Sequence, residues 1–179
     1  FGLTFGFGFY LTGVSWITNA LTFDEQFRFL IPFALILVPL FLSLFLGLTT
    51  LVIGPYLKLD FSSLLIFSAC LAFSDYLRTY LFTGFPWNLW AYSTTSFKEI
   101  LQIVNLVGLN SYNLFVITIF TLPIVAVFKI SKIKKLLSIL LALLSILSFY
   151  IYGNYTINKN KKFLENVSEK TYVKIISPN

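Results

Sequence analysis

Asp75 and Arg78 are the residues of this sequence best suited to chemistry, because they are two charges inside an otherwise apolar segment. Their i, i+3 spacing places both side chains on one face of a helix, within reach of each other. A charge inside a bilayer costs about 2.5–3.5 kcal/mol on insertion scales unless it is paired or reaches polar surroundings. The pair indicates either a functional site or a purely structural one, in which the arginine extends to the membrane surface and fixes the position of its helix.

An aromatic-rich turn follows this pair, in the sequence YLFTGFPWNLWAYS of residues 80–93. Gly84 and Pro86 predict the end of the helix, and Pro86 also restrains the residue before it. The aromatic residues of this stretch fit an interfacial belt, as in many membrane proteins: Phe85, Trp87, Trp90 and Tyr92. However, the backbone groups that such a turn exposes need a wet or buried site, so the turn could also line a cavity.

Other kinds of site have little support in the composition. The chain has no histidine and one cysteine, Cys70, which we interpret as a small buried apolar residue. No cluster of Cys, Asp and Glu has metal-ligand spacing, so we expect neither a metal nor a cofactor. The net charge of +6 does not indicate nucleic-acid binding, because the basic residues are scattered among loops instead of forming one face.

The composition is that of an integral membrane protein: 58% of the 179 residues are hydrophobic, 11% are charged and the mean hydropathy is +0.86. Long unbroken apolar runs indicate helices and not barrel strands, and the charge-free runs are long enough for the roughly 20 residues that cross a bilayer. The sequence therefore predicts an all-α polytopic membrane protein with about five transmembrane helices. We expect the spans at residues 3–21, 30–54, 62–82, 111–129 and 136–152.

The basic loops predict the orientation of these spans. Residues 129–135, KISKIKK, carry four lysines in a short connection, which places this loop in the cytoplasm, and Lys58 agrees with that assignment. The loops at residues 22–29 and 83–110 are then external. With five spans, the first residues lie inside and the tail lies outside.

Two further segments have their own patterns. Residues 96–99, SFKE, have the form of a capping box before a short amphipathic helix with Gly108 as its stop, which suggests either an interfacial helix or the first turns of the next span. The composition then becomes rich in Lys, Asn and Glu near residue 153. We interpret residues 1–152 as the transmembrane domain, 153–170 as a linker and 171–179 as a strand of a further domain, and expect the chain to be an internal fragment of a longer protein.

The stretch LRTYLFTGFPWNLWAYS, residues 77–93, resembles the signature of the bacterial apolipoprotein N-acyltransferases. Three other stretches resemble parts of that family in the same order along the chain: GFGFYLTGVSWI at 6–17, GLNSYNLFV at 108–116 and VKIISPN at 173–179. The last of these resembles the first strand of the family's α/β nitrilase-like domain. Asp75 stands where many members have glutamate, which keeps the charge and the pairing with Arg78.

The resemblance implies an enzyme of the bacterial inner membrane that moves an acyl chain from a phospholipid to the N-terminal cysteine of a diacylated lipoprotein. It also implies a Glu-Lys-Cys triad and a thioester intermediate in the external nitrilase-like domain, so we expect no catalytic residue in this chain and no activity from it alone. The tail would lie on the periplasmic side.

The resemblance further suggests that Arg78 and the turn at residues 83–87 shape a cavity in the outer leaflet that holds the phospholipid. A guanidinium suits a phosphate because it is permanently charged and binds in a bidentate manner. We expect the cavity to be formed by these residues: Asp75, Arg78, Thr83, Gly84, Phe85, Pro86, Trp87 and Tyr92.

Two other functions remain open from the sequence. In a transporter or channel segment, Asp75 and Arg78 would line a pathway, and polar residues at matching depth would be needed on other spans, where Asn113 and scattered Ser and Thr are available. A noncatalytic membrane scaffold would explain the hydrophobicity but not the turn.

Overall fold

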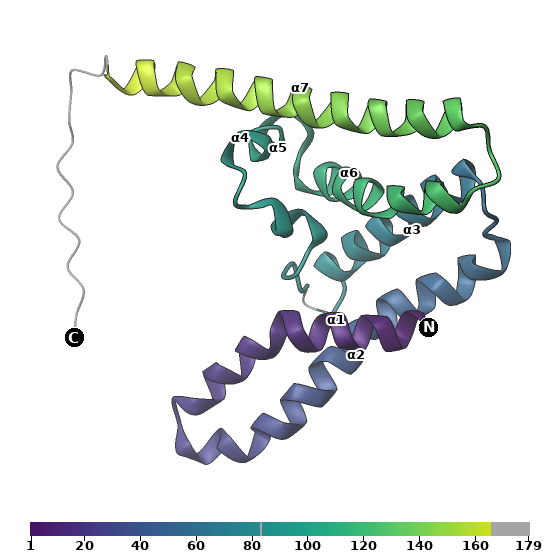
Figure 1. Cartoon of the computed structure of the whole chain (residues 1–179). Helices are drawn as coiled ribbons and strands as arrows, with labels where there is room; N and C mark the ends of the chain where they lie inside the picture. Colours follow the sequence, from purple (N-terminus) through teal and green to yellow (C-terminus); the bar gives the residue numbers. More distant parts are fainter. Residues whose placement is uncertain (83, 166–179) are drawn as a thin grey trace.

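The computed structural model describes residues 1–82 and 84–165, which fold into helices joined by short turns, with no strand among them (Figure 1). The α-helices, in chain order, are α1 Gly2–Val14, α2 Ile31–Ile53, α3 Phe61–Tyr80, α4 Lys98–Leu101, α5 Val104–Val107, α6 Leu109–Thr121 and α7 Lys132–Glu165. The 3-10 segments are η1 Ser15–Thr22, η2 Glu25–Leu30, η3 Gly54–Tyr56, η4 Trp90–Thr94 and η5 Leu122–Val127.

Helices α1 and α2 form an antiparallel hairpin at one side of the bundle (Figure 1). Tyr10 and Val14 of α1 pack on Leu42 of α2, and all three side chains are buried. The connection is made by η1 and η2, and the side chain of Asp24 caps η2 by accepting a hydrogen bond from the backbone N–H of Gln26. The hairpin gives the 84–92 segment, described below, an apolar surface to pack on.

Helix α3 lies between α2 and α6 and is the centre of the bundle. It begins at a cap in which the Asp60 carboxylate accepts a hydrogen bond of 2.7 Å from the backbone N–H of Ser63. Leu71 of α3 packs with Leu46 of α2 and Ile117 of α6 in a buried cluster. These contacts hold the middle of α3 on both sides, so that its polar residues one to two turns later are fixed in position.

The expected helix over residues 96–108 is divided into α4 and α5. The predicted capping box is wrong, because α4 has Phe97 as its N-cap residue and receives no side-chain cap hydrogen bond. The predicted stop is confirmed: Gly108 has a φ of +77°, which ends α5, and α6 starts at the next residue.

Helix α7 packs mainly on α4 (Figure 1), and its Phe149 ring lies 4.6 Å from that of Phe115 on α6. Most of its other large apolar side chains are exposed. Gly153 is the buried residue of this long helix, and it lies against the backbone carbonyl of Glu99 so closely that a β-carbon at this position would collide with it. The expected span at 136–152 is therefore part of a longer helix, which continues through the first part of the expected linker to Glu165.

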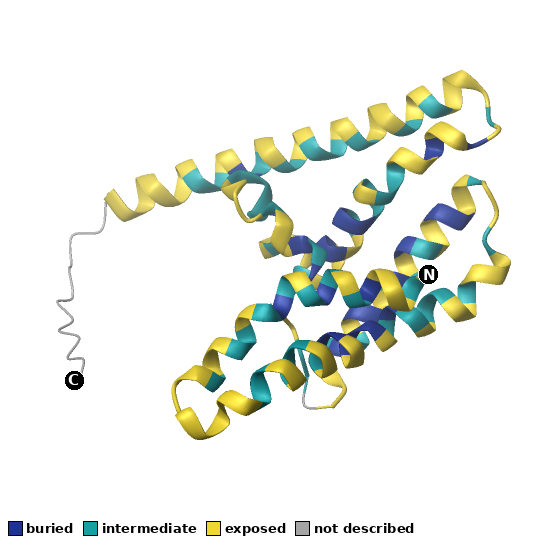
Figure 2. Cartoon of the chain, turned by 60° about the horizontal axis from the view of Figure 1, so that its bottom comes forward, coloured by how far each residue is buried: buried dark blue, intermediate teal, exposed yellow. Residues whose placement is uncertain are grey.

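The outward surface of the bundle is apolar, as a lipid environment requires. Buried residues gather where α1, α2, α3 and α6 meet, whereas large hydrophobic side chains are exposed along the helices (Figure 2). Within residues 1–82 and 84–165, four helical segments are long and apolar enough to cross a membrane: Glu25–Tyr56, Phe61–Tyr80, Leu109–Val127 and Lys132–Glu165. The all-α membrane fold is therefore confirmed.

The first expected span, 3–21, is divided between α1 and the 3-10 segment η1, and it is not among those four. The number of five spans accordingly stays a prediction. The strand expected at 171–179 and the last residues of the linker lie outside the described residues.

Candidate lipid-site scaffold at the end of helix α3

The predicted pairing of Asp75 with Arg78 is present at the end of α3. A guanidinium nitrogen of Arg78 donates a hydrogen bond of 3.1 Å to an oxygen of the Asp75 carboxylate. Both residues are buried, with relative exposures of 1% for Arg78 and 4% for Asp75. The arginine therefore does not extend to the membrane surface, and the pair lies inside the protein.

Arg78 holds the chain that follows its own helix. Its Nη1 donates to the backbone carbonyl oxygen of Phe85 at 2.8 Å and to that of Trp87 at 2.7 Å. The guanidinium carbon also lies 5.3 Å from the centre of the Tyr10 ring on α1, in the geometry of a cation–π contact. The guanidinium therefore joins α3, α1 and the turn, and its planar fork suits it to several acceptors at once.

Asn113 of α6 completes this arrangement. Its side-chain nitrogen donates to the second carboxylate oxygen of Asp75 at 2.9 Å, and its side-chain oxygen accepts from the backbone N–H of Ala91 at 2.9 Å. Asn113 is 1% exposed. We call Asp75, Arg78 and Asn113 the buried clamp. From the sequence, Asn113 was noted only as a polar residue on another span, and its position two residues after the start of the expected span 111–129 was the available signal.

The turn itself begins earlier than the sequence suggests. Helix α3 ends at Tyr80, several residues before Gly84, so the assignment of Gly84 and Pro86 as the helix end is wrong. The backbone leaves the helix at Leu81, which is extended, and Phe82 then adopts a positive φ of +53°. The N–H of Phe85 returns to the carbonyl of Arg78 at 2.9 Å, so the turn is closed by the backbone of the clamp arginine.

Gly84 is required for this turn. Its φ is +79°, a region that side-chain-bearing residues rarely adopt, and a β-carbon there would lie 2.5 Å from the carbonyl oxygen of Thr79. Thr83, which the sequence also placed in the site, lies outside the described residues.

The side chains of the 84–92 segment point in two directions. Phe85 packs inward on the cluster of Tyr10, Val14 and Leu42. Trp87 is 53% exposed and meets Trp16 of η1 edge to face, with ring centres 5.7 Å apart. Pro86 is also exposed, and its carbonyl accepts a hydrogen bond of 3.1 Å from the Tyr92 hydroxyl.

The structure thus brings together seven of the eight residues expected at the site, although these residues have different structural roles. Asp75 and Arg78 are buried supports, Gly84 and Phe85 form the turn, and Pro86, Trp87 and Tyr92 present an exposed surface. Over the described ranges, no group of three His, Cys, Asp or Glu side chains could hold a metal ion. Cys70 is partly buried and belongs to a different surface of α3.

Apolar helices of spanning length define the class of this protein as an integral membrane protein. At one end of its bundle, a buried ion pair holds an aromatic turn. Comparison with known proteins narrows this class. The family model described as "Apolipoprotein N-acyltransferase N-terminal domain" matches residues 1–122, and the chain belongs to that family. It is a bacterial membrane protein.

Individual relatives agree with this assignment. The chain is 35% identical to the apolipoprotein N-acyltransferase of Brucella melitensis over 102 residues, which cover 56% of this chain and 19% of the relative. It is 36% identical to that of Rickettsia typhi over 102 residues, covering 56% and 20%. It is 36% identical to that of Rhodopseudomonas palustris over 95 residues, covering 52% and 18%. The matched part of the chain thus spans about a fifth of the length of each relative, and no solved structure matches.

Proposed function

We propose that this chain is the membrane part of an apolipoprotein N-acyltransferase, which transfers an acyl chain from a phospholipid to the N-terminal cysteine of a diacylated lipoprotein. The observation that supports this most is the family match over residues 1–122, which includes the whole clamp and the 84–92 segment. The enzyme acts in the bacterial inner membrane, with the tail after α7 on the periplasmic side.

The chemistry takes place on a part of the protein that follows this chain. A thiolate there attacks an ester carbonyl of the phospholipid, a thioester forms and the lysophospholipid leaves. The α-amine of the lipoprotein then attacks the thioester, an amide forms and the thiolate is released. Within this scheme, the described residues bind and orient the lipid.

The buried clamp determines the role of Arg78 in that scheme. Its Nη1 already donates to two carbonyls and Nη2 to a carboxylate, and the residue is 1% exposed, so a phosphate would have to displace internal contacts to reach it. We therefore assign Arg78 and Asp75 a positioning role. The exposed side chains of Trp87 and Tyr92, held by the turn, contact the acyl donor at interfacial depth.

The test uses the full-length protein reconstituted in phospholipid vesicles that carry a radiolabelled acyl chain, with thioester formation as the readout. Arg78→Ala should lower the rate of thioester formation strongly while the protein still inserts into the membrane. Arg28→Ala is the matched control, because Arg28 is an exposed arginine paired with Glu25. If the wild-type enzyme forms no labelled thioester, the proposed function is refuted. If Arg78→Ala forms the thioester at the normal rate, the buried clamp has no role in that function.

A second pair of variants covers the case in which Arg78→Ala does not fold. Trp87→Ala removes an exposed side chain and should raise the phospholipid concentration needed for half-maximal labelling. Phe97→Ala removes an aromatic side chain of similar exposure, 57%, outside the turn and should leave that concentration unchanged. Equal behaviour of the two variants would show that the turn does not contact the donor.

A further inference from the structure

A second apolar surface lies along the first half of α3, before the clamp, and the proposed function does not use it. One cavity of about 620 Å³ is bounded by α1, α2, α3, α6 and η4. A neighbouring cavity of about 490 Å³ runs between α3, α6 and η5 to the α2–α3 connection. The two share Phe67, Phe120 and Thr121, and we call them together the α3–α6 groove.

The lining of the α3–α6 groove suits hydrocarbon. Its hydroxyl groups are already engaged within the protein: Thr121 donates to the carbonyl of Ile117 at 3.0 Å, Thr50 donates to that of Leu46 at 3.0 Å, and the Ser63 oxygen accepts from the N–H of Lys58 at 2.8 Å. The remaining lining of the interior is aliphatic or aromatic. Each cavity has a volume within the range of about 300–1,000 Å³ that ligand pockets occupy.

The length of the groove matches one leaflet of a bilayer. On α3 it extends from Ser63 to Leu71, which is about 12 Å at roughly 1.5 Å of rise per residue. Half of a hydrocarbon core is about 15 Å thick. The deep end is closed by Trp90, whose ring stacks on Phe9 at 4.6 Å and meets Phe120 edge to face at 6.2 Å. A chain entering at Ser63 would therefore end near the bilayer midplane.

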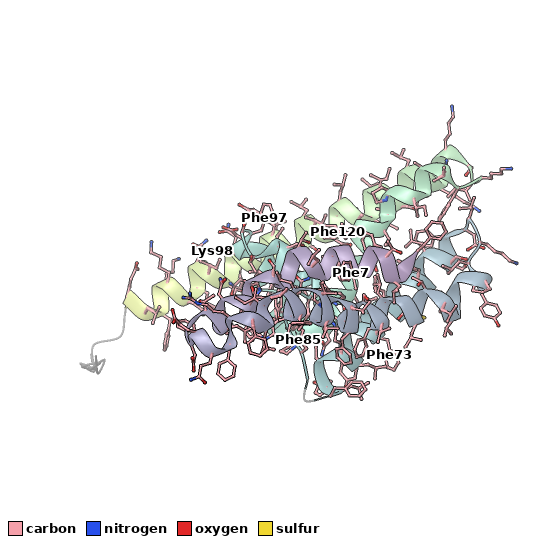
Figure 3. All side chains as sticks on the ribbon, turned by 90° about the horizontal axis from the view of Figure 1, so that it is seen from below. Phe7, Phe73, Phe85, Phe97, Lys98 and Phe120 are labelled. Atoms are coloured by element: carbon pink, nitrogen blue, oxygen red, sulfur yellow. The ribbon has the colours of Figure 1, made fainter. Side chains whose placement is uncertain are left out.

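The open end of the groove is positively charged. Lys58 lines it and is exposed, and Phe128, which also lines it, is followed directly by the lysine-rich connection to α7. The two connections at this end, residues 54–60 and 128–135, hold five lysines and one carboxylate, that of Asp60, which is engaged in capping α3. We call this the lysine end of the bundle; Lys98 lies toward the other end (Figure 3).

We propose that the α3–α6 groove holds one acyl chain of an anionic phospholipid from the leaflet at the lysine end, with the headgroup beside Lys58. Three features favour this occupant: the apolar lining, the length of one leaflet and the lysines at the open end. A zwitterionic lipid would gain little binding energy from the lysines, and an apolar protein helix would fill the groove without any contact to them. The bound lipid is distinct from the acyl donor, whose proposed contacts lie beyond Trp90.

The test uses the full-length protein in phosphatidylcholine vesicles containing phosphatidylglycerol with a diazirine in one acyl chain, followed by irradiation and peptide mapping. A diazirine near the ester should label the segment around Ser63 and Leu64, and one at the chain end should label the segments around Leu71 and Ile117. The reversed depth order would show that the lipid comes from the other leaflet, and even labelling of all exposed helices would show that no groove lipid exists; either result overturns the proposal.

Two pairs of variants sharpen this test. Thr50→Trp fills the groove and should abolish its labelling, whereas Val52→Trp, on an exposed face of the same helix at 65% exposure, should not change it. Lys58→Gln should lower the preference for phosphatidylglycerol over a matched phosphatidylcholine probe by about fivefold, and Lys98→Gln should leave it unchanged. An unaltered lipid preference in Lys58→Gln would refute the proposal. So would an unlabelled groove, which would show that another protein segment or a second copy covers it.

Discussion

The carboxamide of Asn113 on α6 donates a hydrogen bond of 2.9 Å to the carboxylate of Asp75 on α3, and this contact joins two residues that are 38 positions apart in the sequence. The same carboxamide accepts from Ala91, and the same carboxylate accepts from Arg78. Arg78 on α3 and Asn113 on α6 thus hold the 84–92 segment by its backbone, and the Asp75 carboxylate joins the two side chains. The first two predictions test these supports separately.

Replacing Asp75 by asparagine should destabilise the protein strongly. The change leaves the Arg78 guanidinium buried without its counter-ion, and removing one partner of a buried ion pair typically costs about 3–5 kcal/mol. The free energy of unfolding, measured by titration with a denaturing detergent, should fall accordingly. Asp24→Asn alters an exposed carboxylate and serves as the control. A loss no larger than that of Asp24→Asn would contradict a structural role for the pair.

Replacing Asn113 by leucine should cost about 1–3 kcal/mol, because the Ala91 N–H and one Asp75 oxygen are left without their partner in a buried site. The matched control is Asn110→Leu, an exposed asparagine on the same helix. A double-mutant cycle with Asp75→Asn should show strong coupling, since both residues belong to one hydrogen-bond network. Additive losses would mean that Asn113 acts independently of the clamp.

Replacing Gly84 by alanine should disturb the turn, although glycine has no side-chain contact to lose. A β-carbon at this position meets the Thr79 carbonyl, and the positive φ adds strain of the order of 1–3 kcal/mol. We expect faster proteolysis of the 84–92 segment in the variant. Gly8→Ala is the control, because a β-carbon there meets nothing within 4 Å. Equal protease resistance of the two variants would show that the turn tolerates a side chain.

The cap of α3 should make its start sensitive to acid. The hydrogen bond from the backbone N–H of Ser63 is the main cause that holds the pKa of Asp60 below its ordinary value, and the Ser63 hydroxyl and Lys58 act in the same direction. A carboxyl whose pKa is lowered by folding stabilises the folded state above its unfolded-state pKa and loses this contribution as the pH falls through the folded-state pKa.

This contribution can be isolated by comparing wild type with Asp60→Asn, which keeps a capping oxygen but does not titrate. The difference in melting temperature should be constant near neutral pH and should shrink below about pH 4. Asp60→Ala removes the cap entirely and should melt below both proteins near neutral pH. A difference between wild type and Asp60→Asn that does not change with pH would show that the cap does not depend on the charge.

The membrane character of the protein was predictable because hydrophobicity is a local property. Charge-free runs locate α2, α3, the α6–η5 segment and the start of α7 to within several residues. The expected span 111–129 is divided at Thr121 into α6 and η5, and α7 continues past its expected end at 152 because nothing in its polar last turns breaks a helix. The Asp75–Arg78 pair was predictable for the same reason: its i, i+3 spacing on one helix determines the contact. The division of residues 96–108 into α4 and α5 was not predictable from the local pattern, which continues through both helices.

A bundle of apolar helices with one charged pair and one aromatic turn can be predicted from the residues alone, since helix period, hydrophobicity and turn residues act over a few positions. The inward direction of Arg78 toward the carbonyls of Phe85 and Trp87, and its link to Asn113 through Asp75, depend on the packing of separate helices. A buried polar group needs hydrogen-bond partners, and the fold brings them from distant parts of the chain. In this protein those partners lie on another helix and on a loop.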